Sequence, residues 1–162
     1  MVVDSSGIDL ERIDLGYLAL FLGQRINELV VSRLVHAGFK HVRESHGYVI
    51  QHLIECDRSV TDLARRMGVT QQAASKTTAE MIRLGILESK TAIDRRSRVI
   101  RLSNRAWESI QFSRRARARI DRRLAALVGV MNYRRMKACL IECLTELGGV
   151  QSIRSRTVPE PQ

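Results

Sequence analysis

The chain has 162 residues, of which 44% are hydrophobic, so it is long and apolar enough to bury the core of a single domain. No stretch approaches the ~18 apolar residues of a membrane span, and the first residues lack the basic and apolar segments of a secretion signal. Three cysteines are too few for a disulfide scaffold. We therefore expect a cytoplasmic protein with no membrane partner.

Positive charge is concentrated in the middle of the chain. There are 27 Lys and Arg against 17 Asp and Glu, a net charge of +10. Between Arg58 and Arg123 there are 17 basic and 6 acidic residues, whereas the rest of the chain holds 10 basic and 11 acidic residues. The basic centre predicts a polyanionic partner, and the near-neutral ends predict a different, apolar role.

The first predicted element is a long helix over residues 10–35. Its apolar residues recur at steps of three and four, which is the period of one helix face. Phe21, Val30 and Leu34 widen this stripe, so we expect the helix to pack on two sides, one of them covered by a second chain. A shorter amphipathic helix is predicted over residues 44–56.

A helix-turn-helix is predicted next. Ser59, three residues ahead of Asp62, is a capping pattern that begins a short helix, and Gly68 ends that helix. Thr70 can cap a second helix over residues 71–84. Two helices joined by a tight glycine turn are the arrangement that places the second helix in a DNA major groove.

The second half of the chain is predicted to form a β-hairpin and two helices. The strands cover residues 86–91 and 98–103 and flank a polar segment. The helices cover residues 104–128 and 133–147. In the first of them we expect an apolar side to face the interior: Trp107, Ile110, Ile120, Leu124 and Leu127. The arginine run from Arg114 to Arg123 is interpreted as a solvated helix face rather than a second DNA contact.

Hydrogen-bond donors gather on the predicted reading helix and on the tip of the hairpin. On the helix they are Thr70, Gln71, Gln72, Ser75 and Lys76, which suit base edges and phosphates in a major groove. On the hairpin they are Arg95, Arg96 and Arg98, which suit a narrow minor groove or the phosphate backbone. Together these elements predict a winged helix-turn-helix.

The chain resembles the MarR family of bacterial transcriptional regulators, named for multiple antibiotic resistance. The resemblance covers about residues 15–147 and lies in the segments 63–71, Ser75–Lys76, 85–87 and the D-x-R pattern of Asp94 and Arg96. It implies that Asp94 orients Arg96 toward DNA, that the terminal helices form a homodimer, and that a small aromatic or lipophilic molecule releases the DNA. Thr77 and Thr78 depart from the aliphatic residues common on the buried side of the family's reading helix.

Three residues are candidates for contact with such a molecule. Arg43, His46 and Tyr48 carry polar tips beside apolar bodies, which suit an anionic phenolic compound. Capping or packing roles are the alternative for the same three residues. The resemblance implies a binding cleft between the dimer helices and the DNA-binding lobe.

The cysteines and histidines favour structural roles. Cys139 and Cys143 are four residues apart but lack further metal ligands nearby, so core or interface packing is the preferred interpretation. Cys56 leaves open a thiol-switched regulator. The histidines at 36, 41, 46 and 52 do not have metal-site spacing. No catalytic motif is present, so we expect neither an enzyme nor a cofactor.

The sequence therefore predicts a mostly α fold with one β-hairpin, arranged as a winged helix-turn-helix with flanking dimerisation helices. The predicted divisions are a flexible tail over 1–9, a dimerisation helix and loop over 10–40, a DNA-binding domain over 41–103, dimerisation helices over 104–150 and a tail over 151–162. The predicted function is a homodimeric, nucleoid-associated regulator that binds an imperfect palindrome in double-stranded DNA and represses a nearby gene. A non-sequence-specific architectural DNA-binding protein and a protein-interaction winged helix remain alternatives.

Overall fold

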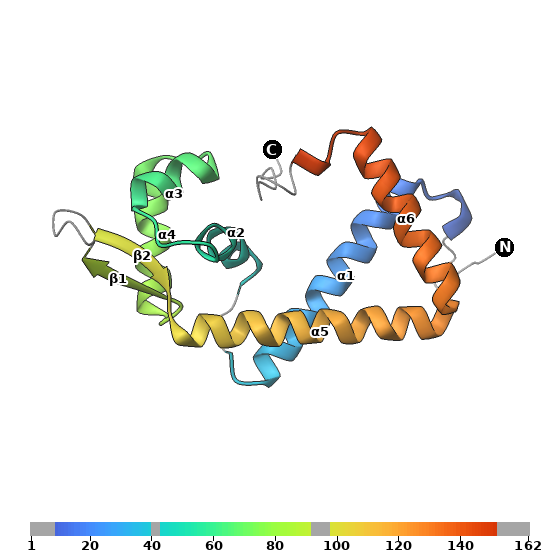
Figure 1. Ribbon diagram of the computed structural model, residues 1–162, viewed down its shortest axis with the longest axis horizontal. Helices are drawn as coiled ribbons and strands as arrows, with labels where there is room; N and C mark the ends of the chain where they lie inside the picture. The colour runs from blue at the N-terminus through green and yellow to red at the C-terminus, as the bar shows by residue number, and fades with distance from the viewer. Residues whose placement is uncertain (1–8, 40–42, 92–97, 152–162) are drawn as a thin grey trace.

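The computed structural model describes residues 9–39, 43–91 and 98–151 (Figure 1). The elements in chain order are η1 (Leu10–Arg12), α1 (Leu15–His36), α2 (Glu44–Leu53), α3 (Val60–Met67), α4 (Gln71–Arg83), β1 (Leu87–Thr91), β2 (Arg98–Leu102), α5 (Asn104–Val128) and α6 (Val130–Glu146). This order confirms the predicted fold class, a mostly α chain with one β-hairpin. None of the helices in the described ranges is both long and apolar enough to cross a bilayer.

Local capping groups explain where the observed boundaries differ from the predicted ones. The first helix begins at Leu15 rather than Leu10, because the Asp14 carboxylate accepts a hydrogen bond from the backbone N–H of Tyr17 and caps it there. The second helix ends at Leu53, three residues short of Cys56. The last helix begins at Val130, directly after Gly129, whose φ of 86° lets the chain turn sharply out of α5.

The first core cluster holds the winged helix-turn-helix together. Val49 of α2, Leu63 of α3, Met81 of α4 and Leu87 of β1 are all fully buried in it, and the start of α5 closes it. The strands pair in the register Leu87↔Leu102 through Thr91↔Arg98. Burial of four large side chains at ~1.5–3 kcal/mol each fixes α4 firmly against the rest of the lobe.

Backbone pairing also ties the lobe to the segment before α3. Arg58 and Ile100 exchange two backbone hydrogen bonds, with N···O distances of 3.0 and 2.7 Å. The Arg58 side chain donates to the backbone carbonyl of His52, at the end of α2. The α2–α3 connection is therefore fastened to the hairpin by main-chain as well as side-chain bonds.

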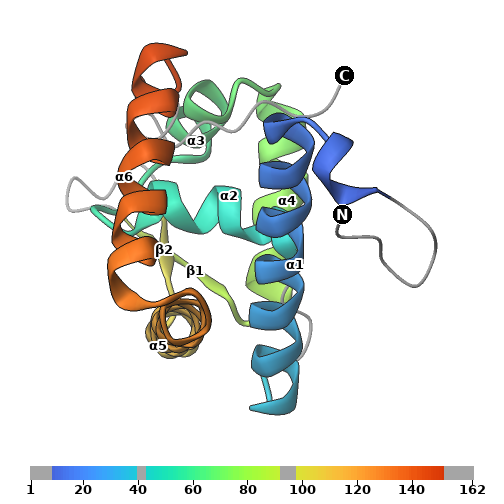
Figure 2. The same ribbon diagram turned by 90° about the vertical axis from the view of Figure 1, so that its right-hand side faces the viewer.

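The second core cluster joins α1 to the middle of α5. Val30 and Leu34 of α1 pack against Ala116 and Ile120 of α5, and all four are buried. In Figure 1, α5 runs along the whole molecule from the hairpin to α6. Figure 2 shows α6 rising from the far end of α5, with α1 on the opposite side. The second cluster thus lies apart from the winged helix-turn-helix lobe.

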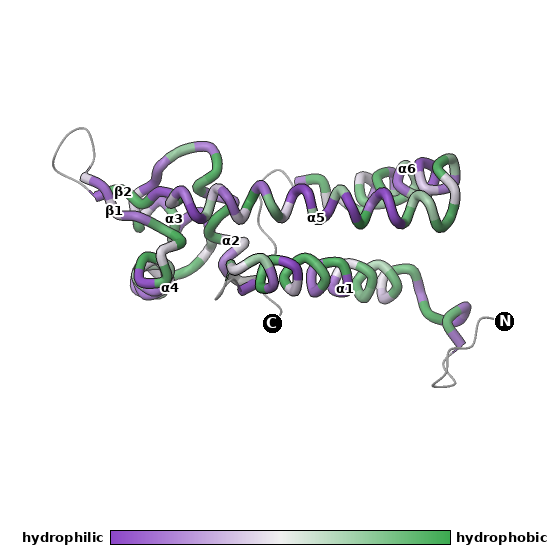
Figure 3. Tube along the Cα trace, turned by 90° about the horizontal axis from the view of Figure 1, so that it is seen from below, coloured by the Kyte–Doolittle hydropathy of each residue, from purple (hydrophilic) through white to green (hydrophobic). Residues whose placement is uncertain are grey.

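Large apolar side chains remain exposed on the first half of α1 and along α6. Figure 3 shows that hydrophobic residues recur along both helices. Phe21 is 57% exposed, Ile141 55% and Leu147 84%. Two interior predictions for α5 were wrong, because Trp107 is 36% and Leu127 78% exposed. Leu127 lies next to the last residue of α5, past Ile120, the last α5 residue that is buried against α1.

Candidate nucleic-acid interface

The turn between α3 and α4 sets the position of the candidate reading helix. Gly68 takes a left-handed conformation, with φ of 70°, and its backbone N–H bonds back to carbonyls at the end of α3. Two residues later the Thr70 hydroxyl accepts a hydrogen bond from the backbone N–H of Ala73, at 3.2 Å. Both capping predictions are confirmed, and α4 therefore starts at a fixed point two residues after the turn.

The buried side of α4 fastens it to the lobe. Ala74, Thr78 and Met81 are buried on this side. The Thr78 hydroxyl donates to the backbone carbonyl of Ala74, at 2.8 Å. Because this hydroxyl is satisfied within its own helix, a threonine at a position that is commonly aliphatic in the MarR family packs without an unpaired polar group.

The opposite side of α4 presents the predicted DNA contacts together. Gln71, Gln72, Ser75 and Lys76 are all exposed, and with Ala79 they line one shallow hollow on the surface. Thr70 lies at the head of the same surface, where its hydroxyl serves as the cap. The structure therefore brings all five predicted helix residues onto one face, which carries amide, hydroxyl and ammonium donors and a single positive charge.

The described part of the hairpin adds further positive charge beside α4. Arg98 begins β2 and is exposed, paired in register with Thr91. Farther along, Arg101 donates two hydrogen bonds to one carboxylate oxygen of Glu88, at 2.7 and 3.0 Å, and so ties the two strands together. The predicted contacts Arg95 and Arg96, and the predicted orienting residue Asp94, lie outside the described residues.

An arginine cluster on α3 was not predicted from the sequence. The Asp62 carboxylate accepts hydrogen bonds from Arg58, Arg65 and Arg66. These bonds hold the pKa of Asp62 well below its usual range. Arg65 has the largest effect, followed by Arg66 and Arg58. The signal was present as spacing, since the three arginines lie four residues before and three and four residues after Asp62. Asp62 therefore fixes the orientation of a basic edge at the start of the helix-turn-helix.

Two of the three predicted effector residues are joined to the lobe. The Arg43 guanidinium forms an ion pair with Glu80 of α4, with an N···O distance of 3.5 Å. His46 is 3% exposed, and its Nδ1 accepts a hydrogen bond from the backbone N–H of Arg43, at 3.3 Å. Burial lowers the pKa of His46, against a smaller opposing effect of Glu80. His46 thus caps α2, and Tyr48 on the same helix is half-buried.

A small pocket lies between α2, α4 and α5. Its lining is mostly apolar: Phe39, Ile50, Leu84, Ile86, Arg105, Ala106 and Ser109. Arg105 is turned toward the loop after α1, where it donates to the backbone carbonyl of Gly38. Arg43, His46 and Tyr48 are not among the residues that line this pocket in the described part of the chain.

The cysteines do not pack in the core of the single chain. Cys56, Cys139 and Cys143 are all exposed free thiols. Core packing of Cys139 and Cys143 is therefore wrong for one subunit, while interface packing on α6 stays a prediction. Across residues 9–39, 43–91 and 98–151, His, Cys, Asp and Glu do not gather in any group of three or more that is suited to a metal ion.

The helix-turn-helix of α3 and α4, the adjacent hairpin and the long helices on either side place the chain in the class of winged helix-turn-helix proteins with long flanking helices. Among solved structures, S. aureus MepR in complex with DNA matches with a TM-score of 0.65 at 15% identity, covering 82% of this chain and 98% of that one. A MarR family protein from Bacillus stearothermophilus matches with a TM-score of 0.59 at 20% identity, covering 83% and 90%. S. aureus MepR bound to ethidium bromide matches with a TM-score of 0.61 at 14% identity, covering 85% and 99%.

The chain thus has the fold of MarR family regulators, over most of its length and nearly the full length of theirs. No protein-family model and no curated protein matches the sequence itself. The predicted resemblance is therefore confirmed at the level of the fold.

Proposed function

We propose that this protein is a homodimeric transcriptional regulator of the MarR type, which binds a specific site in double-stranded DNA. The observation that carries the proposal is the exposed face of α4, where Gln71, Gln72, Ser75 and Lys76 lie together on a helix that is capped and buried on its other side. Such a face offers hydrogen-bond donors to base edges and phosphates from a rigid support. The fold shared with the MepR–DNA complex supports the same assignment.

The exposed apolar faces support a dimer. The first half of α1 and most of α6 expose large hydrophobic side chains, with exposed fractions between 39% and 61% on α6. Contiguous apolar surface of this kind marks a protein interface. In this proposal residues 10–40 and 104–150 form the dimer and residues 41–103 bind DNA. A two-fold axis would place two α4 helices in successive major grooves, about 34 Å apart, on an imperfect palindrome.

Binding at a promoter would repress transcription, and a small aromatic or lipophilic compound would release the DNA. Arg43 supports a link from such a compound to the reading helix, because its guanidinium is paired with Glu80 of α4. An anionic ligand at Arg43 would compete with that carboxylate. S. aureus MepR, which shares the fold, has been solved with ethidium bromide bound. The proposed compartment is the cytoplasm, at the nucleoid.

The proposal is tested by selecting genomic fragments that purified protein retains and sequencing them. The expected result is a single imperfect palindrome whose affinity exceeds that of bulk DNA by at least ~10³. Equal binding of all sequences would instead favour an architectural DNA-binding protein. Absence of DNA binding at moderate salt would favour a winged helix that binds an acidic protein, and would end the proposal.

Effector release is tested on the labelled complex with the selected fragment. Small aromatic acids and lipophilic cations are titrated into the complex, with wild-type protein and with Arg43→Ala. The expected result is that an anionic aromatic compound releases wild-type protein and that the variant needs at least ~10-fold more of it, equal to ~1.4 kcal/mol. If no compound releases DNA and Arg43→Ala behaves as wild type, the ligand part of the proposal is lost.

A thiol switch is the second candidate for the signal, since Cys56 is exposed between α2 and α3. If oxidation of this thiol controlled binding, peroxide would release wild-type protein from the selected fragment and Cys56→Ser would stay bound. A response that persists in Cys56→Ser would exclude Cys56 as the sensor.

A further inference from the structure

The middle of α5 carries a stripe of exposed arginines that the proposed DNA interface does not use. Arg115, Arg119 and Arg122 are spaced four and three residues apart, so they lie on one side of the helix, and all three are exposed. We call them the arginine stripe. Arg114 and Arg123, also exposed, lie on either side of it.

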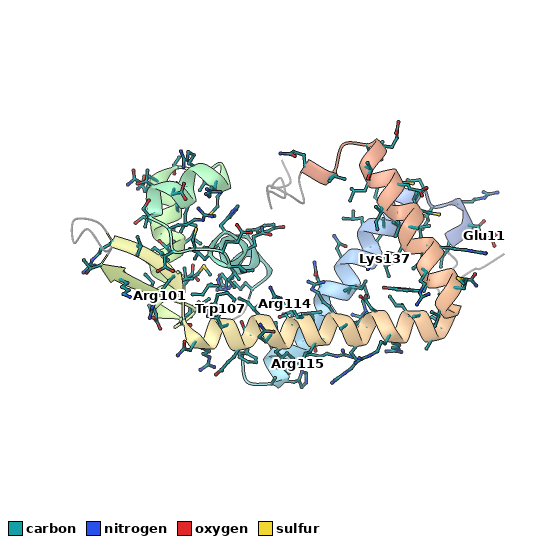
Figure 4. All side chains as sticks on the ribbon, viewed as in Figure 1. Glu11, Arg101, Trp107, Arg114, Arg115 and Lys137 are labelled. Atoms are coloured by element: carbon teal, nitrogen blue, oxygen red, sulfur yellow. The ribbon has the colours of Figure 1, made fainter. Side chains whose placement is uncertain are left out.

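The stripe lies on the outer side of α5. The side that packs on α1 lies roughly 110° around the helix from the stripe. Ala116 and Ile120 are buried there, and Arg117 donates to the Asn27 side chain at 2.6 Å. Figure 4 shows Arg115 projecting from α5 on the side away from α2 and α6. The stripe is therefore separate from the exposed apolar faces of α1 and α6, and it would stay accessible in a dimer built on those faces.

The stripe lacks the carboxylates that normally accompany arginines on a solvated helix. The positions three and four residues before and after each stripe arginine contain no Asp or Glu, and several contain another arginine. Like charges at this spacing repel each other and destabilise the helix. The nearest carboxylate along the helix, Asp121, is directed at Tyr133 of α6, whose pKa is raised by burial and by this carboxylate. An ordinary solvated face would instead alternate in sign.

The spacing of the stripe suits the phosphates of duplex DNA. From Arg115 to Arg122 the helix rises ~10 Å, over which it offers three guanidinium groups. One strand of duplex DNA presents a phosphate about every 3.4 Å along its axis, so about three phosphates occupy the same length. Guanidinium groups pair with phosphate through two parallel hydrogen bonds, which suits a backbone contact without sequence preference.

We propose that the arginine stripe binds a second segment of double-stranded DNA, so that a protein held at its own site by α4 can bridge to another duplex. The inference rests on the proposed DNA-binding function. Because the stripe lies on a different side of α5 from the α1 contact and on the middle of the helix, beyond the hairpin, it is not part of the surface that α4 and Arg98 form. Each dimer would carry two stripes, one on each outer flank.

The test is a bridging assay with full-length protein. A short duplex containing the selected palindrome is fixed on beads and saturated with protein, excess protein is washed away, and a labelled short duplex of scrambled sequence is added. The experiment is run near 0.15 M salt, where the screening length of about 8 Å separates the stripe from the α4 surface. The variants are a triple substitution, R115A/R119A/R122A, and a charge-preserving control, R115K/R119K/R122K.

Wild-type protein is expected to capture the scrambled duplex, and the triple alanine variant to capture at least ~10-fold less while its affinity for the palindrome changes less than about twofold. The lysine variant should retain most of the capture, because phosphate attraction is largely electrostatic. The slope of log capture against log salt should fall by about 0.9 for each phosphate contact removed. Helical circular dichroism of the alanine variant should equal that of wild type, since all three side chains are exposed.

Three results overturn the inference. Equal capture by wild type and the alanine variant would show that the stripe does not bind DNA. If wild-type protein captures no scrambled duplex but binds polyglutamate through the stripe, the stripe would be assigned to an acidic protein partner. Loss of palindrome affinity in the alanine variant would show that the stripe belongs to the primary interface. Failure of the proposed function is distinct from all of these, because wild-type protein would then select no palindrome in the first place.

Discussion

Lys76 lies on the exposed face of α4 among Gln72 and Ser75, where a phosphate or a guanine edge would meet a mobile ammonium group. Arg122 of α5 serves as the control for the positive charge of Lys76, because it is also exposed but lies on the outer side of α5. Comparing the two residues separates a local contact from the general effect of net charge, which acts over the whole +10 chain.

We expect Lys76→Ala to weaken binding to the selected palindrome about tenfold, or ~1.4 kcal/mol, because one charge-assisted contact per subunit is lost. The log–log salt slope should fall by about 0.9 for each contact, so by nearly two per dimer. Fluorescence anisotropy against salt measures both quantities. Arg122→Ala should leave them nearly unchanged, and an equal loss in both variants would mean that only net charge matters.

His46 gives the lobe a dependence on pH. Its folded-state pKa lies below the ordinary value of 6.5 because the ring is buried, so the neutral ring is the form that fits. The unfolded chain binds the proton first as pH falls. The contribution of His46 to stability is therefore fully present above about pH 6.5 and is lost as pH falls toward the lowered pKa.

We expect the free energy of unfolding to decrease between pH 7.5 and pH 5.5, by at most ~1.4 kcal/mol per pH unit for this one group. Urea unfolding at several pH values measures the decrease. His46→Gln should reduce it, whereas His36→Gln is the matched control, because His36 is exposed on α1. The same decrease in wild type and His46→Gln would assign the effect to other groups.

At the scale of elements, α5 combines two requirements that oppose each other. Its buried side must pack on α1 and on the winged helix-turn-helix, which it does through Ile110, Ala116 and Ile120. Its outer side carries arginines at spacings where like charges repel. A helix of 25 residues with caps at both ends tolerates this repulsion, and the excess charge stays available to a partner.

We expect Arg119→Glu to raise the free energy of unfolding by ~1–3 kcal/mol. The new carboxylate lies four residues from Arg115 and from Arg123 and three from Arg122, so three repulsive pairs of ~0.2–0.5 kcal/mol each become attractive pairs of similar size. Denaturant unfolding at low salt measures the gain, which high salt should reduce. Arg119→Gln, which removes charge without adding it, should gain about half as much; a loss of stability in Arg119→Glu would contradict this account of α5.

At the scale of the whole molecule, the two core clusters leave α6 and the first half of α1 without a covering layer. Phe21 and Tyr17 stack on each other at a ring distance of 6.2 Å, yet both are 57% exposed. Aromatic surface of this size is rarely left in water by a stable monomer. In the predicted homodimer, a second copy of the chain would cover these exposed apolar faces.

We expect Phe21→Glu to convert a dimer into a monomer, since a charge would be buried without a partner at the interface. Sedimentation equilibrium measures the change in mass, and affinity for the full palindrome should fall at least ~100-fold because the two half-sites are no longer bound together. Phe21→Leu keeps an apolar side chain at the same position without adding charge, and is the matched control. A dimer of unchanged affinity in Phe21→Glu would place the interface elsewhere.

Most element boundaries were predictable from the sequence because they depend on local chemistry. Thr70, Gly68 and Ser103 cap or end helices through bonds that span two to four residues, and their effects are readable from spacing alone. The reading face of α4 was predictable for the same reason, since a helical period assigns Gln72 and Lys76 to one side. Where local signals were weak, as at the end of α2, the prediction ran three residues too far.

Contacts between distant segments depend on the tertiary structure. The pairing of Arg43 with Glu80, the bond from Arg117 to Asn27 and the bridge from Arg58 to Ile100 join residues far apart in the chain. The exposure of Trp107 and Leu127 likewise depends on which helices α5 meets along its length. Sequence alone determined the helices, the turn, the basic centre and the side of α4 that faces outward, because these follow from neighbouring residues. Only the packing of the elements decided which charges are paired and which apolar faces stay uncovered, because both depend on segments that folding brings together.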